Sequence, residues 1–269
     1  MLPILLDLNV VRIYTNGVFL LLAFFWGSFL LWKNFLLTAN KEETIFDGLF
    51  ISIAGGLLAG RLLHVILNFE DFGFNLLKFI LINGYPGISL YGLLIGAFIS
   101  LRLYFKSRKI DVVESFDYVI PAVFLSLGLG KLGSFLSGSE IGSKTNFFAS
   151  VRYPGFEGAR HLTSFYESIL FLVFAFVAYK ILFAIRRGKF EKGTNHYFFW
   201  LVFSCVYLIF DFFKSNKALI FGYSFNLFVS LVILLTIALI SIYHFRSFIK
   251  KYGKKIFKGF YKKEKRKAS

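Results

Sequence analysis

Four charged side chains in this sequence lie inside long apolar stretches. A charge that is shielded from water there interacts more strongly with an oppositely charged ligand than a solvated charge does. Arg61 and Lys131 are the cations, and Glu167 and Asp211 are the carboxylates. A charge at the centre of a membrane costs at least ~2.5–3.5 kcal/mol, so each of these residues needs a partner or a purpose. Buried cations can hold a phosphate group. The alternative is a set of structural ion pairs, such as Arg61 with Asp211.

Further polar groups occur close to these residues in the chain. Glu140 and His161 lie in residues 138–162, the longest connection between apolar stretches, and Lys214 follows Asp211. Long connections in compact membrane proteins often cover a site. The four histidines are scattered along the chain, so the sequence indicates no metal site, and no motif for a cofactor is present.

The composition indicates that membrane-spanning helices carry these residues. Of the 269 residues, 57% are hydrophobic and 17% are charged, against about 25% charged residues in soluble domains. The apolar residues occur in runs of ~20, the length that crosses ~30 Å of hydrocarbon. We therefore predict an all-α integral membrane protein with about seven transmembrane helices, at residues 16–37, 46–67, 86–105, 113–137, 163–185, 196–213 and 219–243.

One further apolar segment, residues 72–83, is too short to cross a membrane. We expect it to be interfacial or re-entrant. Pro86 and Gly87 follow this segment and are expected to open the third span, because proline is tolerated in the first turn of a helix.

Lysine and arginine set the expected orientation, because loops that stay in the cytoplasm are enriched in them. They are concentrated in residues 33–41, 102–109 and 180–192 and in the tail, which are alternate connections of the seven predicted spans. The N-terminus is therefore expected outside and the C-terminus in the cytoplasm. On this topology the polar groups named above all lie toward the outer half of the membrane, which implies a polar cavity that faces the outer leaflet.

The net charge of +16 is then mostly loop charge and does not indicate a nucleic-acid-binding protein. Residues 1–245 are expected to form one membrane-embedded domain, and residues 246–269 a basic cytoplasmic tail. In this tail, basic residues alternate with aromatic and aliphatic ones, a pattern that suits an anionic membrane surface. A solvated tail without a partner is the alternative.

Small residues recur at every fourth position in three of the predicted spans. They are Gly56 and Gly60 in the second, Gly92, Gly96 and Ser100 in the third, and Ser126, Gly130 and Ser134 in the fourth. Small residues at this spacing let helix backbones approach closely. In the fourth span a glycine-rich stretch can also expose backbone amides to a phosphate, and the two roles are compatible.

Several segments, taken in order, resemble the bacterial prolipoprotein diacylglyceryl transferases. Residues 130–142, GKLGSFLSGSEIG, are similar to the family signature, roughly G-R-x-G-N-F-x-N-x-E-x-x-G. Residues 89–96, SLYGLLIG, resemble S-F-H-G-G-L-x-G, and residues 161–167, HLTSFYE, resemble H-P-S/T-Q-L-Y-E. VRIY at 11–14, residues 60–72 and YLIFDFFK at 207–214 fit the family's opening I-R-W-Y-G, its second span and its R-F-x-x-E-F-F-R.

The resemblance implies an enzyme of the bacterial plasma (inner) membrane that transfers the diacylglyceryl group of phosphatidylglycerol to the lipobox cysteine thiol of a prolipoprotein. A thioether forms and glycerol 1-phosphate leaves. The thiol must become a thiolate to attack, and fixed cations must hold the phosphate as charge develops on the leaving group. The implied catalytic residues are Tyr91, His161 and Lys131. The implied substrate-binding residues are Tyr14, Arg61, Ser134, Ser137, Glu140, Tyr166, Glu167, Tyr207 and Asp211.

The chain departs from the family motifs at several of these positions. The replacements are Tyr91 for histidine, Lys131 and Tyr207 for arginine, Ser134 and Ser137 for asparagine, and Asp211 for glutamate. The signature glutamate aligns with Ser139, and Glu140 lies one place later. On a helix this shift would rotate the side chain by ~100°, although a loop could absorb it.

Three accounts are compatible with these departures. In the first, which we favour, the chain is an active transferase that uses Lys131 and Arg61 for the phosphate and His161 or Tyr91 near the thiol. In the second it has a different donor lipid or acceptor, and in the third it binds lipid or lipopeptide without catalysis. A small transporter is an alternative of another class. Transporters usually contain internal repeats, and the sequence shows no convincing repeat between its halves.

Overall fold

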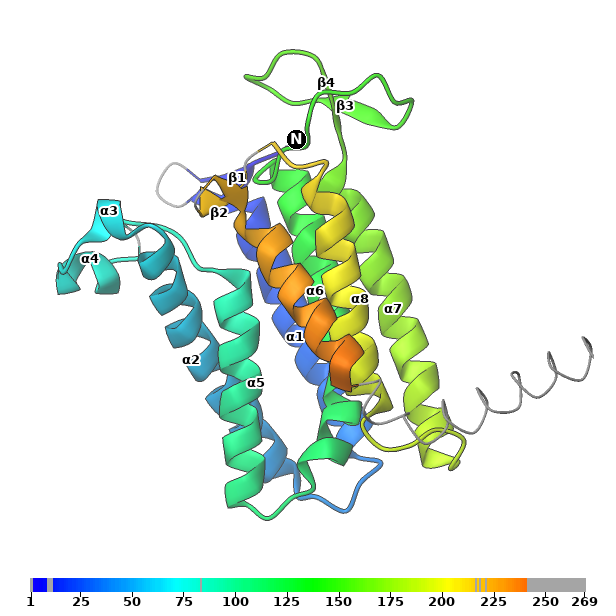
Figure 1. The fold of residues 1–269 in the computed structure, drawn as a ribbon. Helices are drawn as coiled ribbons and strands as arrows, with labels where there is room; N and C mark the ends of the chain where they lie inside the picture. The colour runs from blue at the N-terminus through cyan, green and yellow to red at the C-terminus, as the bar shows by residue number, and fades with distance from the viewer. Residues whose placement is uncertain are drawn as a thin grey trace, which may run out of the picture.

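The computed structural model of the chain describes residues 2–8, 12–82, 84–215, 217, 219–220 and 222–240, and in this part the fold is mainly helical (Figure 1). The long helices are α1 (Thr15–Phe35), α2 (Glu42–Leu67), α5 (Leu90–Ser107), α6 (Val112–Ser137), α7 (Thr163–Arg186), α8 (Thr194–Asp211) and the final helix Phe225–Ile240. Each of the seven predicted spans overlaps one of them over most of its length. Five of them, α1, α2, α5, α6 and α7, are long and apolar enough to cross a membrane. The prediction of an all-α integral membrane protein is therefore confirmed.

The number of spans and the orientation stay predictions, because length and composition alone do not decide them. The basic tail, residues 246–269, and its boundary at residue 245 lie outside the described residues.

The short elements gather near one end of the long helices (Figure 1). Helices α3 (Phe69–Phe72) and α4 (Leu76–Ile80) follow α2. Three antiparallel pairs join β1 (Ile4–Asp7) to β2 (Arg12–Tyr14), β3 (Ser150–Arg152) to β4 (Ala159–His161), and β5 (Leu219–Ile220) to β6 (Tyr223–Ser224). The apolar segment 72–83 thus forms short helical pieces that are too short to cross a membrane.

The expected start of the third span at Pro86 is wrong, because α5 begins at Leu90. Gly87 has a φ of 144°, which a right-handed helix does not allow. Its carbonyl oxygen accepts a hydrogen bond of 2.9 Å from the Arg61 guanidinium, and the Ser89 amide donates to the Gly60 carbonyl at 3.0 Å. These contacts fix residues 87–89 as a non-helical segment against the end of α2.

Helices α2 and α5 pack backbone against backbone through their glycines. A Cβ atom at Gly92 would lie 2.6 Å from the Ala59 carbonyl oxygen, and one at Gly96 would lie 2.4 Å from the Ala59 Cβ. Real Cβ atoms do not approach other atoms this closely, so only glycine fits. The packing role predicted for the small residues of these two helices is confirmed.

The small residues of α6 serve two surfaces. Gly128 packs against Leu172 of α7, and Gly133 against Phe19 of α1. The predicted series Ser126, Gly130 and Ser134 instead lines a cavity between α1, α2, α5 and α6. Ser126 also donates a hydrogen bond of 3.0 Å to the Ala23 carbonyl of α1, so at that position packing and cavity lining coexist.

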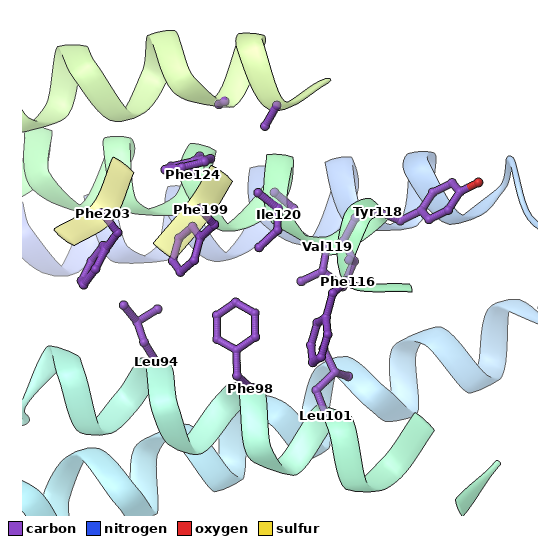
Figure 2. Packing of buried hydrophobic residues seen from close by; sticks show 14 of the residues in the cluster. Leu94, Phe98, Leu101, Phe116, Tyr118, Val119, Ile120, Phe124, Phe199 and Phe203 are labelled. Atoms are coloured by element: carbon purple, nitrogen blue, oxygen red, sulfur yellow. The ribbon is translucent and has the colours of Figure 1, made fainter. Parts of the chain in front are cut away.

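Aromatic side chains connect the α2–α5 pair to the rest of the bundle. Phe98 of α5 lies with its ring centroid 5.2 Å from that of Phe116 on α6 and 5.4 Å from that of Phe199 on α8. Figure 2 shows Leu94, Phe98 and Leu101 pointing from α5 toward these helices. Because large rings span the distance, α5 is joined to α6 and α8 without the close backbone approach it makes to α2.

The glycine contact between α2 and α5 predicts the effect of one added methyl group. Gly96→Ala should destabilise the protein by about 1–3 kcal/mol, because the Cβ meets both Ala59 and the Gly55 carbonyl. Gly17→Ala on α1 is the matched control. Among the described residues, no atom outside its chain neighbours and its own helix backbone lies within 4 Å of the added Cβ, so helix propensity should make this variant neutral or stabilising by up to about 1 kcal/mol. The midpoint of thermal unfolding in detergent measures both, and equal midpoints would contradict the packing account.

Candidate functional site

Lys131 lies at the centre of a buried group of charges. It sits on α6, near the end of the helix, and its side chain is 8% exposed. Its Nζ lies 2.7 Å from Glu140 Oε1 and 2.7 Å from Glu167 Oε2. A buried ammonium group is stable only when carboxylates compensate its charge, and these two supply that compensation.

A second ammonium group, that of Lys214, belongs to the same cluster. Its Nζ lies 2.7 Å from Glu167 Oε1 and 3.6 Å from Glu140 Oε2. Glu167 is fully buried at the start of α7, and each of its carboxylate oxygens pairs with a different lysine. Lys131, Lys214, Glu140 and Glu167 therefore form a charge-balanced group of four, here called the charge quartet.

The aromatic ring of Tyr207 packs against both lysines. Its centroid lies 5.1 Å from the Nζ of Lys131 and 4.7 Å from that of Lys214. The electron-rich face of an aromatic ring attracts cations at such distances. The family motif carries arginines at the positions of both Tyr207 and Lys214, so this chain keeps the cation at Lys214 and has an aromatic ring in place of the other.

The backbone on either side of the quartet is joined by hydrogen bonds. Helix α6 ends at Ser137, and Gly138 adopts a left-handed conformation with a φ of 73°. The segment after it runs antiparallel to residues 213–215, with Ser143 N donating to the Phe213 carbonyl at 2.7 Å. Arg160 Nη1 completes the join with a bond of 3.0 Å to the Gly142 carbonyl. Glu140 lies in this loop and not on a helix, so the ~100° rotation expected for a one-residue shift on a helix does not apply to it.

Electrostatics keeps Glu140 ionised. Burial acts to raise the pKa of its carboxyl, but the ammonium groups of Lys131 and Lys214 outweigh burial and lower this pKa to about 2. The hydroxyl of Ser164 donates a further hydrogen bond of 3.2 Å to its Oε2. Glu140 is therefore a carboxylate throughout the physiological pH range.

An apolar cavity of about 810 Å³ ends at the quartet. It runs between α1, α2, α5 and α6, and the charged residues that line it, within the described part of the chain, are Lys131 and Glu140. Leu20, Phe24 and Leu57 both line the cavity and belong to the exposed surface. The cavity therefore opens between α1 and α2, on a surface that faces lipid in a membrane protein.

Arg61 lies outside the quartet. Its guanidinium is buried and donates to the carbonyl oxygens of Phe79, Gly87 and Lys78 at 2.9, 2.9 and 2.7 Å. These three bonds hold the segment between α2 and α5 against the end of α2. The structural pair of Arg61 with Asp211 is absent: the Asp211 carboxylate instead accepts hydrogen bonds from Ser224 and Asn226.

Tyr91 is buried beside the quartet and not within it. Its ring lies edge-on to Tyr207, with centroids 5.7 Å apart. Its hydroxyl lies 3.2 Å from Ser230 Oγ and donates a 3.4 Å bond to the Asn226 carbonyl, both on the final helix. Tyr91 thus supports one side of Tyr207 and connects α5 to the final helix.

The remaining implied residues are divided between the cavity and the loops. Ser134 lines the cavity, whereas Ser137 donates its hydroxyl to the Ser134 carbonyl at the end of α6. Tyr166 bonds the Ala149 carbonyl at 2.5 Å and so ties the loop 138–162 to α7. The His161 ring packs on Phe213, the residue before Lys214, with centroids 4.8 Å apart. Tyr14 is exposed at the start of α1.

The residue that the implied site omitted is Lys214. Its signal in the sequence was its place in YLIFDFFK, where the family pattern ends in arginine. Its partners were not visible, because Glu140 and Glu167 lie far away in the chain. Among the described residues, no three histidine, cysteine, aspartate or glutamate side chains are grouped to hold a metal ion.

Comparison with known proteins shows the family of the chain. The profile of the prolipoprotein diacylglyceryl transferase family matches residues 3–243. The phosphatidylglycerol–prolipoprotein diacylglyceryl transferase of Clostridium tetani is 29% identical over 80% of this chain and 86% of its own length. Phosphatidylglycerol–prolipoprotein diacylglyceryl transferase 2 of Clostridium perfringens is 24% identical over 76% of this chain and 80% of its own length. One from Listeria monocytogenes is 30% identical over 58% and 59%. Because the profile spans the helices, the cavity and the charge quartet, the chain belongs to the prolipoprotein diacylglyceryl transferase family.

Proposed function

We propose that this protein transfers the diacylglyceryl group of phosphatidylglycerol to the lipobox cysteine of a prolipoprotein, in the plasma membrane of a bacterium. The printed names of the relatives describe this reaction. The observation that carries the proposal is the junction of a lipid-facing apolar cavity with the buried ammonium group of Lys131, which shares both of its carboxylate partners with Lys214. Such a junction matches a substrate with acyl chains at one end and a phosphate at the other.

The lysines of the quartet are the proposed phosphate ligands. As the thiolate attacks the glycerol carbon, a C–S bond forms, the C–O bond to phosphate breaks, and negative charge develops on glycerol 1-phosphate. Ammonium groups fixed in a site with little water stabilise such charge strongly. Arg61 is not needed for this role, because its guanidinium is already bonded to three carbonyl oxygens.

The proton of the thiol requires an acceptor near the outer end of the site. His161 is the proposed group, because a ring nitrogen of imidazole can accept a proton and the ring packs on Phe213, the residue before Lys214. Tyr91 is proposed to position Tyr207, since its hydroxyl is bonded to the final helix.

A second candidate is a member of the same family that binds lipid or lipopeptide without catalysis. Tyr91 and Tyr207 favour it, because they replace the histidine and arginine of the family motifs and both are buried in an aromatic cluster. Formation of the thioether separates the two candidates.

The transfer reaction tests the function and the role of Lys131 together. The purified protein, phosphatidylglycerol and a lipobox peptide should yield a diacylglyceryl adduct on the cysteine, detected by mass spectrometry. Lys131→Ala should lower the rate by about 10²–10³-fold, because a buried cation is lost from the leaving group, and Lys131→Arg should retain activity. Lys144→Ala is the control, since Lys144 is exposed in the outer loop. Absence of any adduct from folded wild-type protein would favour the non-catalytic candidate.

The cavity predicts a steric effect on the lipid. Gly130 lines it, and the nearest atom to an added Cβ is Leu20 Cδ2 at 3.9 Å. Gly130→Phe should therefore fold. Its ring should occupy cavity space next to Lys131 and so weaken phosphatidylglycerol binding by at least about tenfold. Gly17→Phe, at a position where the described part of the chain places no other segment within 4 Å, should bind like the wild type. Equal lipid affinity of the two variants in nanodiscs would contradict the proposal that the acyl chains bind in this cavity.

The proposed orientation places the quartet toward the outer face and the connection between α7 and α8 in the cytoplasm. In a Cys205→Ser background, Lys144→Cys should react with a membrane-impermeant maleimide in intact spheroplasts. Lys189→Cys should react only after permeabilisation. Both positions are exposed, so accessibility is matched. The reverse labelling pattern would invert the topology.

A further inference from the structure

The two carboxylates of the charge quartet differ in how firmly they are held. Glu167 is 0% exposed, lies on a long helix and bridges both lysines. Glu140 is 33% exposed and lies in a loop, and it lines the cavity with Lys131. Of the two, Glu140 is the one that can leave Lys131 without moving a helix.

The quartet also leaves no free charge for a ligand. With both carboxylates in place, two ammonium groups face two carboxylates, so an incoming anion meets a neutral site. Without Glu140, the two lysines and Glu167 carry one net positive charge. A low-dielectric site favours the anion that restores neutrality, because uncompensated charge is costly there.

We propose that the Glu140 carboxylate occupies the phosphate position on Lys131 in the free protein, and that one singly charged phosphodiester displaces it. The exchange replaces one negative charge by one negative charge. Glu140 is thus a specificity-determining residue, which matches the site to a phosphodiester headgroup and not to a doubly charged phosphate monoester. This inference rests on the proposed function, since it concerns how the same site takes its lipid.

The exchange also has a consequence for the product. Cleavage of the C–O bond converts the phosphodiester into glycerol 1-phosphate, a monoester that carries ~1.5–2 negative charges at pH 7. This charge exceeds the single positive charge that Glu140 leaves behind. Return of the Glu140 carboxylate to Lys131 then competes directly with the monoester and favours its release.

The test replaces the competing carboxylate by a neutral group of the same shape. Binding of short-chain phosphatidylglycerol and of glycerol 1-phosphate is measured on full-length Glu140→Gln in detergent. Both should bind more tightly than to wild type, by about tenfold, because the site now has a net positive charge. The gain should be larger for the monoester, and inhibition of turnover by glycerol 1-phosphate should increase by a similar factor.

Two further variants keep the test decisive. Ser164→Ala removes the hydrogen bond that holds Glu140 in place and should shift both affinities in the same direction by a smaller factor, even if Glu140→Gln does not fold. Glu157→Gln changes a fully exposed glutamate of the same loop and should leave both affinities unchanged.

Two results would overturn the inference, and they differ from failure of the function. Unchanged or weaker binding of both anions in the folded variant would show that Glu140 supports the site without competing for it. An equal gain in affinity for both anions would show that Glu140 does not select the ligand by its charge. In either case wild-type transfer to the lipobox peptide would still stand, whereas a wild-type protein that neither binds phosphatidylglycerol nor transfers it would remove the proposed function itself.

Discussion

Two lysine side chains buried within one helix bundle impose the constraint on which this structure depends. Ammonium groups at close quarters repel each other and lose hydration, so they are tolerated only with a carboxylate between them. Glu167 fulfils this need by offering one oxygen to Lys131 and the other to Lys214. Helices α6, α7 and the end of α8 are thereby fixed relative to one another at the level of the site.

The charged site lies at one end of an apolar cavity, and the packing of the helices explains this position. The α2–α5 pair is bound to itself by glycine contacts and to the bundle by aromatic rings, which leaves space between α1, α2, α5 and α6. Lipid chains can occupy such a space, but a headgroup needs polar partners. Lys131 and Glu140 supply them at one end of the cavity. The apolar lining can therefore contact the acyl chains of a lipid while Lys131 contacts its phosphate.

The departures from the family motifs form a coherent set when placed in three dimensions. Tyr207 stands where the family has arginine, and its ring receives the ammonium groups of Lys131 and Lys214. Tyr91 stands where the family has histidine and packs against Tyr207. An aromatic ring next to a cation stabilises the cation without adding charge. The site of this chain therefore holds two cations and two carboxylates, with an aromatic ring where the motif has a third cation.

The sequence by itself determined the membrane class, the positions of the long helices, the small-residue packing of α2 on α5 and the family. These features follow from local periodicity, the length of the apolar segments and the order of the motifs, all of which are properties of the linear sequence. Only the tertiary structure decided which charges meet. Arg61 and Lys131 look alike in the sequence, yet Arg61 binds backbone carbonyls while Lys131 pairs with Glu140 and Glu167. Lys214 joins them because the loop after Gly138 is hydrogen-bonded to residues 213–215, a contact between segments at least 70 residues apart. Which charges pair depends on helix packing and loop geometry, and these cannot be predicted from local sequence patterns.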